Sequence, residues 1–154
     1  MKIQLWTIGK QQDASTREAV EDFTGRINRY FPCEWKLIPP SKSTDPVVIR
    51  KSESQLVMQY LQKDDYLILL DERGKMISSP ELAVLLQQKA NESRKQMIFL
   101  IGGAYGVEKI IQQRADFTWS LSKLVFPHQI VRLILAEQVY RACTILRNEK
   151  YHHD

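Results

Sequence analysis

Short apolar runs alternate with longer stretches of helical periodicity along this chain, and this alternation limits the fold more than any other feature of the sequence. Apolar residues spaced three or four positions apart are typical of amphipathic helices, whereas short apolar runs are typical of strands. Alternating strands and helices build α/β folds. The sequence therefore predicts an α/β protein with a five- or six-stranded, mostly parallel sheet and helices on both faces. The expected strands are Lys2–Ile8, Glu34–Ile38, Tyr66–Leu70, Met97–Ile101 and Phe117–Leu121.

The intervals between these strands carry signals for helix starts. Ser15 and Glu18 have the spacing of a capping box. Asp45–Pro46 and Ser79–Pro80 each join an N-cap residue to a proline that suits the first helical turn. After Pro127 the chain is strongly apolar over a long stretch, which predicts a helix buried on more than one side. Such a helix needs a partner surface.

Length and composition favour one domain spanning residues 1–154. With 154 residues, 44% of them apolar, the chain can bury a core without disulfides or a structural metal. Cys33 and Cys143 match neither a metal-binding pair nor a disulfide framework, which favours a reducing compartment, the cytoplasm. We expect no signal peptide and no membrane-spanning segment. The formal net charge of +4 is compatible with a polyanionic partner.

The expected strands Tyr66–Leu70 and Met97–Ile101 lack polar alternation, which is typical of central strands covered on both faces. In open parallel sheets, ligands bind beyond the carboxyl ends of central strands. Three segments therefore become candidates for a binding site, beginning at Asp71, Gly102 and Ser122.

Two of these segments each allow two interpretations. Asp71–Arg73 is either catalytic or a charged turn in which Gly74 supplies a positive φ. The glycines at 102, 103 and 106 form either a bare tight turn or a loop whose backbone N–H groups hold a ligand. Their spacing matches neither a dinucleotide fingerprint nor a P-loop, so nucleotide sites of those kinds are disfavoured.

The third segment contains Leu124, Val125 and Phe126, which are too apolar for an ordinary solvated connection. Its backbone polar groups must be satisfied if it is buried, so it either meets the edge of a planar ligand or packs against the core.

Histidines gather near the C-terminus, where His152 and His153 follow Tyr151 and precede Asp154. Adjacent histidines at a free end rarely converge on one ion, so a metal site is disfavoured. The tail is either solvated or a stacking and hydrogen-bonding segment for RNA or a partner subunit.

Three motifs in order carry a family resemblance: LIGGAYG, WSLSKLVFPHQIVRLILAEQVYRA and a terminal YHH. Together with the opening MKIQLWTIGK, they make the whole chain resemble the ribosomal RNA large subunit methyltransferase H family. This family is a branch of the SPOUT superfamily of S-adenosylmethionine-dependent RNA methyltransferases. The resemblance implies a homodimer whose C-terminal part forms a trefoil knot. It also implies methylation of N3 of a pseudouridine in 23S rRNA, within the assembled ribosome and not on DNA.

The resemblance also implies which residues form the site. Cofactor recognition would be largely through main-chain groups. The cofactor residues are Leu70, Gly102, Leu121, Ser122, Lys123, Leu124, Val125 and Phe126. The catalytic residues are His128, for orientation or proton removal, Arg132, for electrostatic stabilisation or phosphate anchoring, and the terminal pair Tyr151 and His152, which we expect to act from the other subunit. Where the family pattern leads us to expect a basic residue, this chain has His153 followed by Asp154.

A second class of function remains open, namely a non-catalytic α/β module that binds RNA or the ribosome through the tail and the basic last helix alone. A KH-like clamp at Gly103–Gly106 is disfavoured, because that segment follows a strand whereas the KH loop joins two helices.

Overall fold

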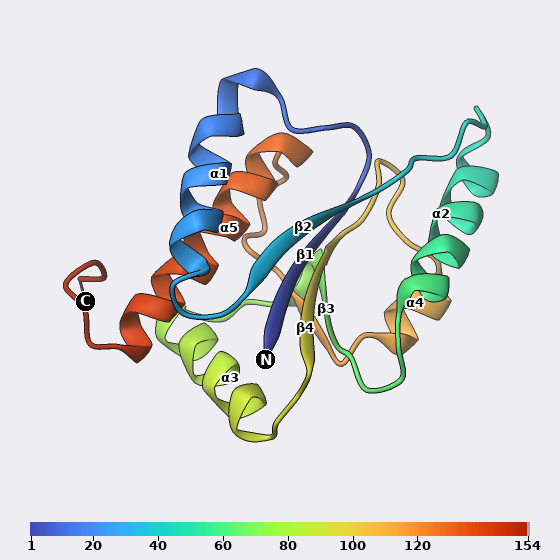
Figure 1. Ribbon diagram of the computed structural model, residues 1–154. Helices are drawn as coiled ribbons and strands as arrows, with labels where there is room; N and C mark the ends of the chain where they lie inside the picture. The colour runs from blue at the N-terminus through green and yellow to red at the C-terminus, as the bar shows by residue number, and fades with distance from the viewer. Residues whose placement is uncertain (154) are drawn as a thin grey trace.

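A five-stranded parallel sheet runs through the middle of the computed structural model, which describes residues 1–153 (Figure 1). The strand order is β2-β1-β4-β3-β5, and every neighbouring pair is parallel. The α/β prediction is therefore confirmed with five strands, whereas the trefoil knot stays a prediction from the resemblance. The strands are β1 (Lys2–Ile8), β2 (Cys33–Ile38), β3 (Tyr66–Lys75), β4 (Gln96–Ile101) and β5 (Phe117–Trp119).

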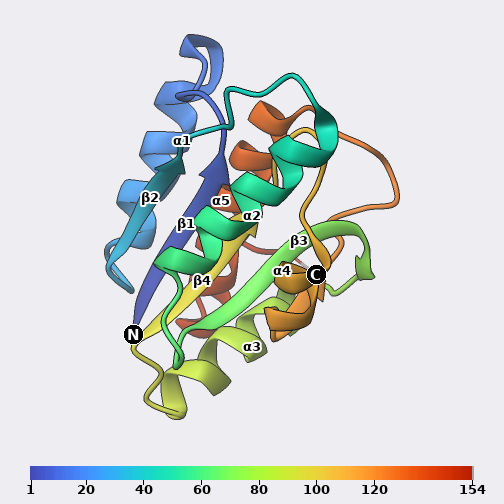
Figure 2. The same cartoon turned by 90° about the vertical axis from the view of Figure 1, so that its right-hand side faces the viewer.

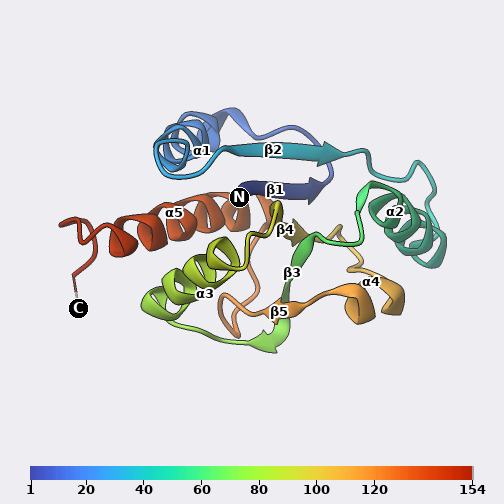
Figure 3. The same ribbon diagram turned by 60° about the horizontal axis from the view of Figure 1, so that its bottom comes forward.

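Helices cover both faces of the sheet, as Figure 3 shows most clearly. On one face α5 (His128–Leu146) lies between α1 (Ala14–Ile27) and α3 (Ser79–Asn91). The other face carries α2 (Pro46–Tyr60) and α4 (Lys109–Arg114), which stand in front of the sheet in Figure 2. No helix within residues 1–153 is both long and apolar enough to cross a lipid bilayer.

Two apolar cores form, one on each side of the sheet. Alternate residues of β4 point to opposite faces, so Met97 and Phe99 join the core beneath α1, α3 and α5, while Ile98 and Leu100 join the core beneath α2 and α4. All four side chains are fully buried. The expectation that the central strands are covered on both faces is confirmed.

Two of the expected helix starts are wrong by one or two residues. Helix α1 begins after Asp13, whose carbonyl accepts the first helical hydrogen bond, so Ser15 lies inside the first turn and forms no capping box. Helix α3 is capped by Ser78, whose Oγ accepts from the backbone N–H of Glu81 at 3.2 Å. The third start is confirmed, since Asp45 Oδ1 accepts from the backbone N–H two residues on at 2.9 Å.

The third strand continues to Lys75, past the expected charged turn, and pairs with β5 on both sides of an irregularity. Gly74 does not take a positive φ, so that part of the turn prediction is wrong. A Cβ at Gly74 would lie 2.5 Å from the carbonyl oxygen of Thr118, so glycine is required by the close approach of β5. The irregularity carries Asp71–Arg73 out of the regular ladder.

Candidate active site

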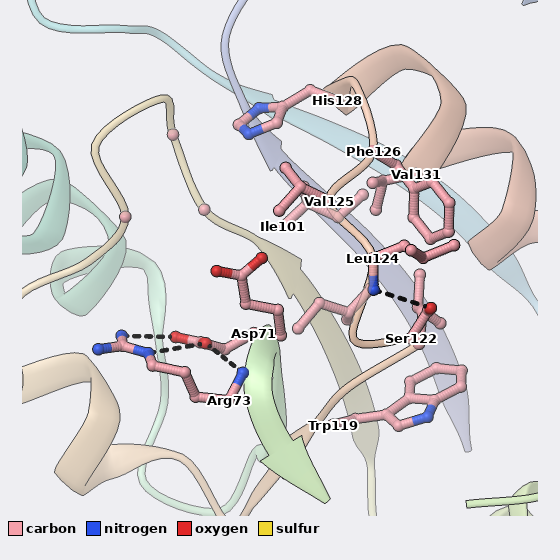
Figure 4. Close-up of a pocket in the computed structure, with 16 residues that line it drawn as sticks. Asp71, Arg73, Ile101, Trp119, Ser122, Leu124, Val125, Phe126, His128 and Val131 are labelled. Carbon is pink, nitrogen blue, oxygen red and sulfur yellow. Dashed lines mark hydrogen bonds and ion pairs between the residues drawn. The ribbon is translucent and has the colours of Figure 1, made fainter. Parts of the chain in front are cut away.

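A cavity of about 360 Å³ lies at the carboxyl ends of β3, β4 and β5 (Figure 4). The three segments selected from the sequence all contribute to its walls, together with the first turn of α5. The lining residues are Leu70–Arg73, Ile101–Gly103, Gly106, Trp119, Leu121, Ser122, Leu124–Phe126, His128 and Val131. Parallel strands end at the same edge of a sheet, which explains why segments far apart in sequence meet here.

The glycine segment forms a tight turn that also lines the cavity. The backbone N–H of Gly106 donates to the carbonyl of Gly103 at 3.0 Å, and Gly106 takes a φ of +75°. A Cβ at Gly103 would lie 2.5 Å from Oε1 of the buried Glu53. The turn is therefore held tightly against α2, and its backbone faces the cavity without side chains in between.

The apolar segment does not pack against the core, so that alternative is wrong. Leu124 and Val125 are 68% and 79% exposed, although both line the cavity. The loop is shaped by Ser122, whose Oγ accepts from the backbone N–H of Leu124 at 3.0 Å and whose carbonyl accepts from the Ser120 hydroxyl at 2.9 Å. Apolar side chains gathered around an open cavity are typical of a surface that a ligand covers.

A charged pair forms one rim of the cavity. Arg73 Nη2 and Nε donate to the carboxylate of Asp71 at 2.9 and 3.1 Å (Figure 4). These hydrogen bonds hold the pKa of Asp71 below its usual range. Asp71 therefore stays ionised near neutral pH and is a weak proton acceptor.

His128 is the histidine at this cavity, as the first residue of α5. Burial, and secondarily the positive charge of Arg132, lower the pKa of His128. The ring is therefore mainly neutral near pH 7, and one of its nitrogens is available to accept a proton.

Replacing this histidine is expected to change how stability depends on pH. The unfolded chain binds a proton at His128 more readily than the folded protein does, so protonation favours unfolding as pH falls through the usual histidine pKa. We expect His128→Gln to remove this loss. Urea unfolding at about pH 7.5 and about pH 5.5, on either side of the usual histidine pKa, measures it as a smaller acid-induced drop in the free energy of unfolding than in the wild type. If the wild type and His128→Gln lose the same free energy of unfolding between the two pH values, the lowered pKa of His128 is contradicted.

Four of the expected site residues lie outside these walls, namely Lys123, Arg132 and the terminal pair Tyr151 and His152. Lys123 belongs to the loop but is exposed and does not line the cavity. Arg132 is only 2% exposed and points into a different cavity. Successive helical residues are rotated by about 100°, so Arg132 faces a different side of α5 from Val131, although it lies only about 40° around the helix from His128.

The terminal pair lies at the opposite end of α5. Tyr151 Oη donates to Glu137 Oε1 at 3.4 Å, and Tyr151 packs edge-on against Tyr140. His152 Nδ1 is 3.2 Å from Arg141 Nη1. Arg141 is about 20 Å along the helix axis from His128 at 1.5 Å per residue, so the tail does not reach the cavity of its own chain.

The last residue of that tail, Asp154, lies outside the described residues, so its expected departure from the family pattern has no structural account. Over residues 1–153, no cluster of three or more histidine, cysteine, aspartate or glutamate side chains could hold a metal ion.

Sequence reasoning missed several residues that line the cavity. Ile101 and Trp119 end their strands, and Val131 follows His128 by three positions on the same helical face. Ile101 ends a predicted strand and Val131 has helical spacing from His128, and these were the available signals, whereas Trp119 lies inside the predicted strand Phe117–Leu121.

The fold and the family are shown by comparison with known proteins. A family model described as a predicted SPOUT methyltransferase matches residues 1–152. A Bacillus anthracis structure described provisionally as an RNA methyltransferase superposes with a TM-score of 0.55 over 98% of this chain and 99% of its own, at 12% identity. A probable methylase family protein from Haemophilus influenzae superposes with a TM-score of 0.51 over 97% of this chain and 67% of its own, also at 12% identity. These two show the fold.

Curated relatives cover the full length of the chain. A Cytophaga hutchinsonii protein is 46% identical over 99% of this chain and 100% of its own, and a Parabacteroides distasonis protein is 40% identical over 100% of both. A Geobacter metallireducens protein is 41% identical over 99% of both. All three are named ribosomal RNA large subunit methyltransferase H. With its parallel α/β sheet and its cavity of glycine turn and apolar loop, this chain belongs to the ribosomal RNA large subunit methyltransferase H family of SPOUT methyltransferases.

Proposed function

We propose that this protein transfers a methyl group from S-adenosylmethionine to N3 of a pseudouridine in 23S rRNA. The observation that carries the proposal is the cavity at the joined ends of β3, β4 and β5, where glycine backbone faces exposed apolar side chains. The names of the relatives support large-subunit rRNA as the substrate, rather than DNA. We further propose that the assembled ribosome, in the cytoplasm, presents this RNA to the enzyme.

The residues of the cavity fit S-adenosylmethionine. The volume of about 360 Å³ lies in the range of small-molecule sites. Leu124, Val125 and Phe126 offer apolar surface to a flat base. Gly102 lines the cavity with its backbone, and a Cβ there would lie 3.2 Å from Val107 Cγ1, so a larger residue would press on Val107. When bound, the cofactor supplies an electrophilic methyl group.

His128 and Arg132 have separate roles in this proposal. Attack by N3 requires loss of its proton, and the neutral His128 ring at the cavity is placed to accept it. Arg132 acts on His128 through its positive charge, which lowers the pKa of the ring, and is a positioning residue at this site.

We propose that the protein works as a homodimer in which the tail of one copy completes the cavity of the other. Within one chain Tyr151 contacts Glu137 and His152 contacts Arg141, which lie about 14 and about 20 Å along α5 from His128. Only a second copy can bring this pair to the cavity while these contacts persist.

Labelled methyl transfer tests the proposed reaction directly. Purified ribosomal subunits and whole ribosomes are incubated with the protein and labelled cofactor, and the nucleosides are analysed by mass spectrometry. We expect label in 3-methylpseudouridine, and only from whole ribosomes. A methylated uridine or cytidine would contradict the specificity. Failure to bind S-adenosylmethionine in calorimetry would instead favour the non-catalytic RNA-binding module.

A pair of valine substitutions tests the cofactor cavity. Val125 is 79% exposed at the cavity, and Val84 is 55% exposed on α3 away from it. We expect Val125→Asn to weaken S-adenosylmethionine binding about tenfold, because burying a valine side chain against a ligand contributes about 1.5 kcal/mol. Val84→Asn is the matched control and should leave the calorimetric affinity unchanged. Equal affinities for the two variants would remove the apolar loop from the site.

A further inference from the structure

A second cavity, of about 250 Å³, lies between α1, the first turns of α5 and the carboxyl ends of β1 and β2. It shares no lining residue with the first cavity. Helix α5 contributes to both cavities, since His128 and Val131 line the first while Arg132 lines the second.

This second cavity contains two buried hydrogen-bond donors that lack acceptors. Arg132 is 2% exposed and Thr7 is 1% exposed. Across residues 1–153, neither Arg132 Nε nor Thr7 Oγ1 has a hydrogen-bond partner. Asp13 attracts the guanidinium through space without forming an ion pair with it. A buried cation or hydroxyl without a partner is unfavourable, so both donors need an acceptor from outside the chain.

The charges on the walls favour an anion. Arg17 and Arg132 outnumber the single acidic residue among the lining side chains, Glu21. Arg17 Nη2 donates to the carbonyl of Gln12 at 3.0 Å, which holds the second cation in place. The donors and the surplus positive charge together match a group with several negatively charged oxygens, such as a phosphate.

The rest of the cavity is apolar and is larger than a phosphate needs. Val20, Trp35 and Leu37 form its other walls. Trp35 Nε1 already donates to Thr24 Oγ1 at 2.9 Å, so the indole presents apolar surface to the cavity. A flat aromatic wall beside a phosphate site suits a nucleoside.

We propose that this second cavity binds a nucleotide, with phosphate oxygens accepting from Arg132 Nε and Thr7 Oγ1 and the nucleoside against Trp35. The nucleotide is either free or one residue of an RNA chain, since both present the same phosphate. The proposal does not depend on binding of S-adenosylmethionine, because the two cavities share no lining residue, although Arg132 also acts on His128 through its charge.

Calorimetric titration with uridine 5′-monophosphate, inorganic phosphate and a short single-stranded RNA tests the site. We expect saturable binding of the nucleotide, weaker binding of inorganic phosphate, and about tenfold weaker nucleotide binding by Thr7→Val because one hydrogen bond to a charged group is lost. Valine has nearly the shape of threonine, and the free protein gives this hydroxyl no partner. The thermal unfolding midpoint of Thr7→Val should therefore stay equal or rise.

Two further variants sharpen the result. Arg132→Lys keeps the charge but removes the Nε donor, so it should also weaken nucleotide binding. Arg147→Gln removes an exposed cation near the end of α5 and is the control for general charge effects. S-adenosylmethionine titrated into the same proteins reports separately on the first cavity.

Binding of the RNA through Thr7 and Arg132 with higher affinity than the mononucleotide would support the site and identify an RNA chain as its source. Binding of the mononucleotide alone would support a free nucleotide. Unchanged affinity in both Thr7→Val and Arg132→Lys, or no saturable binding of any of the three probes, would overturn the proposal.

Discussion

An equimolar mixture of two inactive variants is expected to recover methyl transfer that neither shows alone. Gly102→Val adds a branched side chain to a residue that lines the cofactor cavity, and its Cβ would lie 3.2 Å from Val107 Cγ1 and displace the turn. The other variant, Tyr151→Ala with His152→Ala, removes the tail pair. If each site joins one copy's cavity to its partner's tail, a mixed dimer holds one intact site. Random pairing then gives about a quarter of the wild-type rate, since half of the dimers carry one of two sites.

The matched control mixes two variants of the same cavity. Gly102→Val and His128→Gln both alter cavity residues, so every site in a mixed dimer is damaged and the mixture should stay inactive. Copies carrying different affinity tags, refolded together, show that mixed dimers have formed. If mixed dimers of the Gly102→Val variant and the tail variant form but show no methyl transfer, the tail of one copy does not complete the cavity of the other.

Gly74→Ala is expected to destabilise the protein by about 3 kcal/mol, the upper end of the range for overpacking. The added Cβ would lie 2.5 Å from the Thr118 carbonyl oxygen and 2.7 Å from its carbon, and backbone cannot yield as a flexible side chain can. Strand β5 must move away from β3. Urea unfolding measures the loss, and weaker binding of S-adenosylmethionine should accompany it, because Ser120 N–H donates to the Lys75 carbonyl just before the cavity loop.

Gly25→Ala is the matched control for this substitution. Gly25 lies within α1, and a Cβ there would meet no heavy atom within 4 Å. Alanine is favoured over glycine inside a helix, so this variant should be stabilised by about 0.8 kcal/mol. If both alanine variants change the free energy of unfolding in the same direction, then glycine at position 74 is not explained by the close approach of β3 and β5.

The fold class was predictable because periodicity is a local property. Met97–Ile101 is apolar at every position, and this pattern alone indicates a strand covered on both faces. Boundaries were less predictable. Ser78 and Glu81 have capping-box spacing, but the Ser79–Pro80 pair led to a predicted helix start one residue later. Gly74 has the composition of a turn residue, and only the structure shows that the backbone of Thr118 lies against it.

The sequence by itself determined the strands, their order along the chain and the three strand ends that carry the glycines, the apolar loop and His128. Only the tertiary structure decided which of the neighbouring cations and rings share a cavity. Arg132 is four residues from His128, yet α1 and β1 cover its side of the helix and enclose it in a second cavity. Sequence spacing sets the face on which a side chain lies, whereas long-range packing sets what meets that face. The tail likewise lies against α5 through Glu137 and Tyr140, contacts that no local pattern encodes.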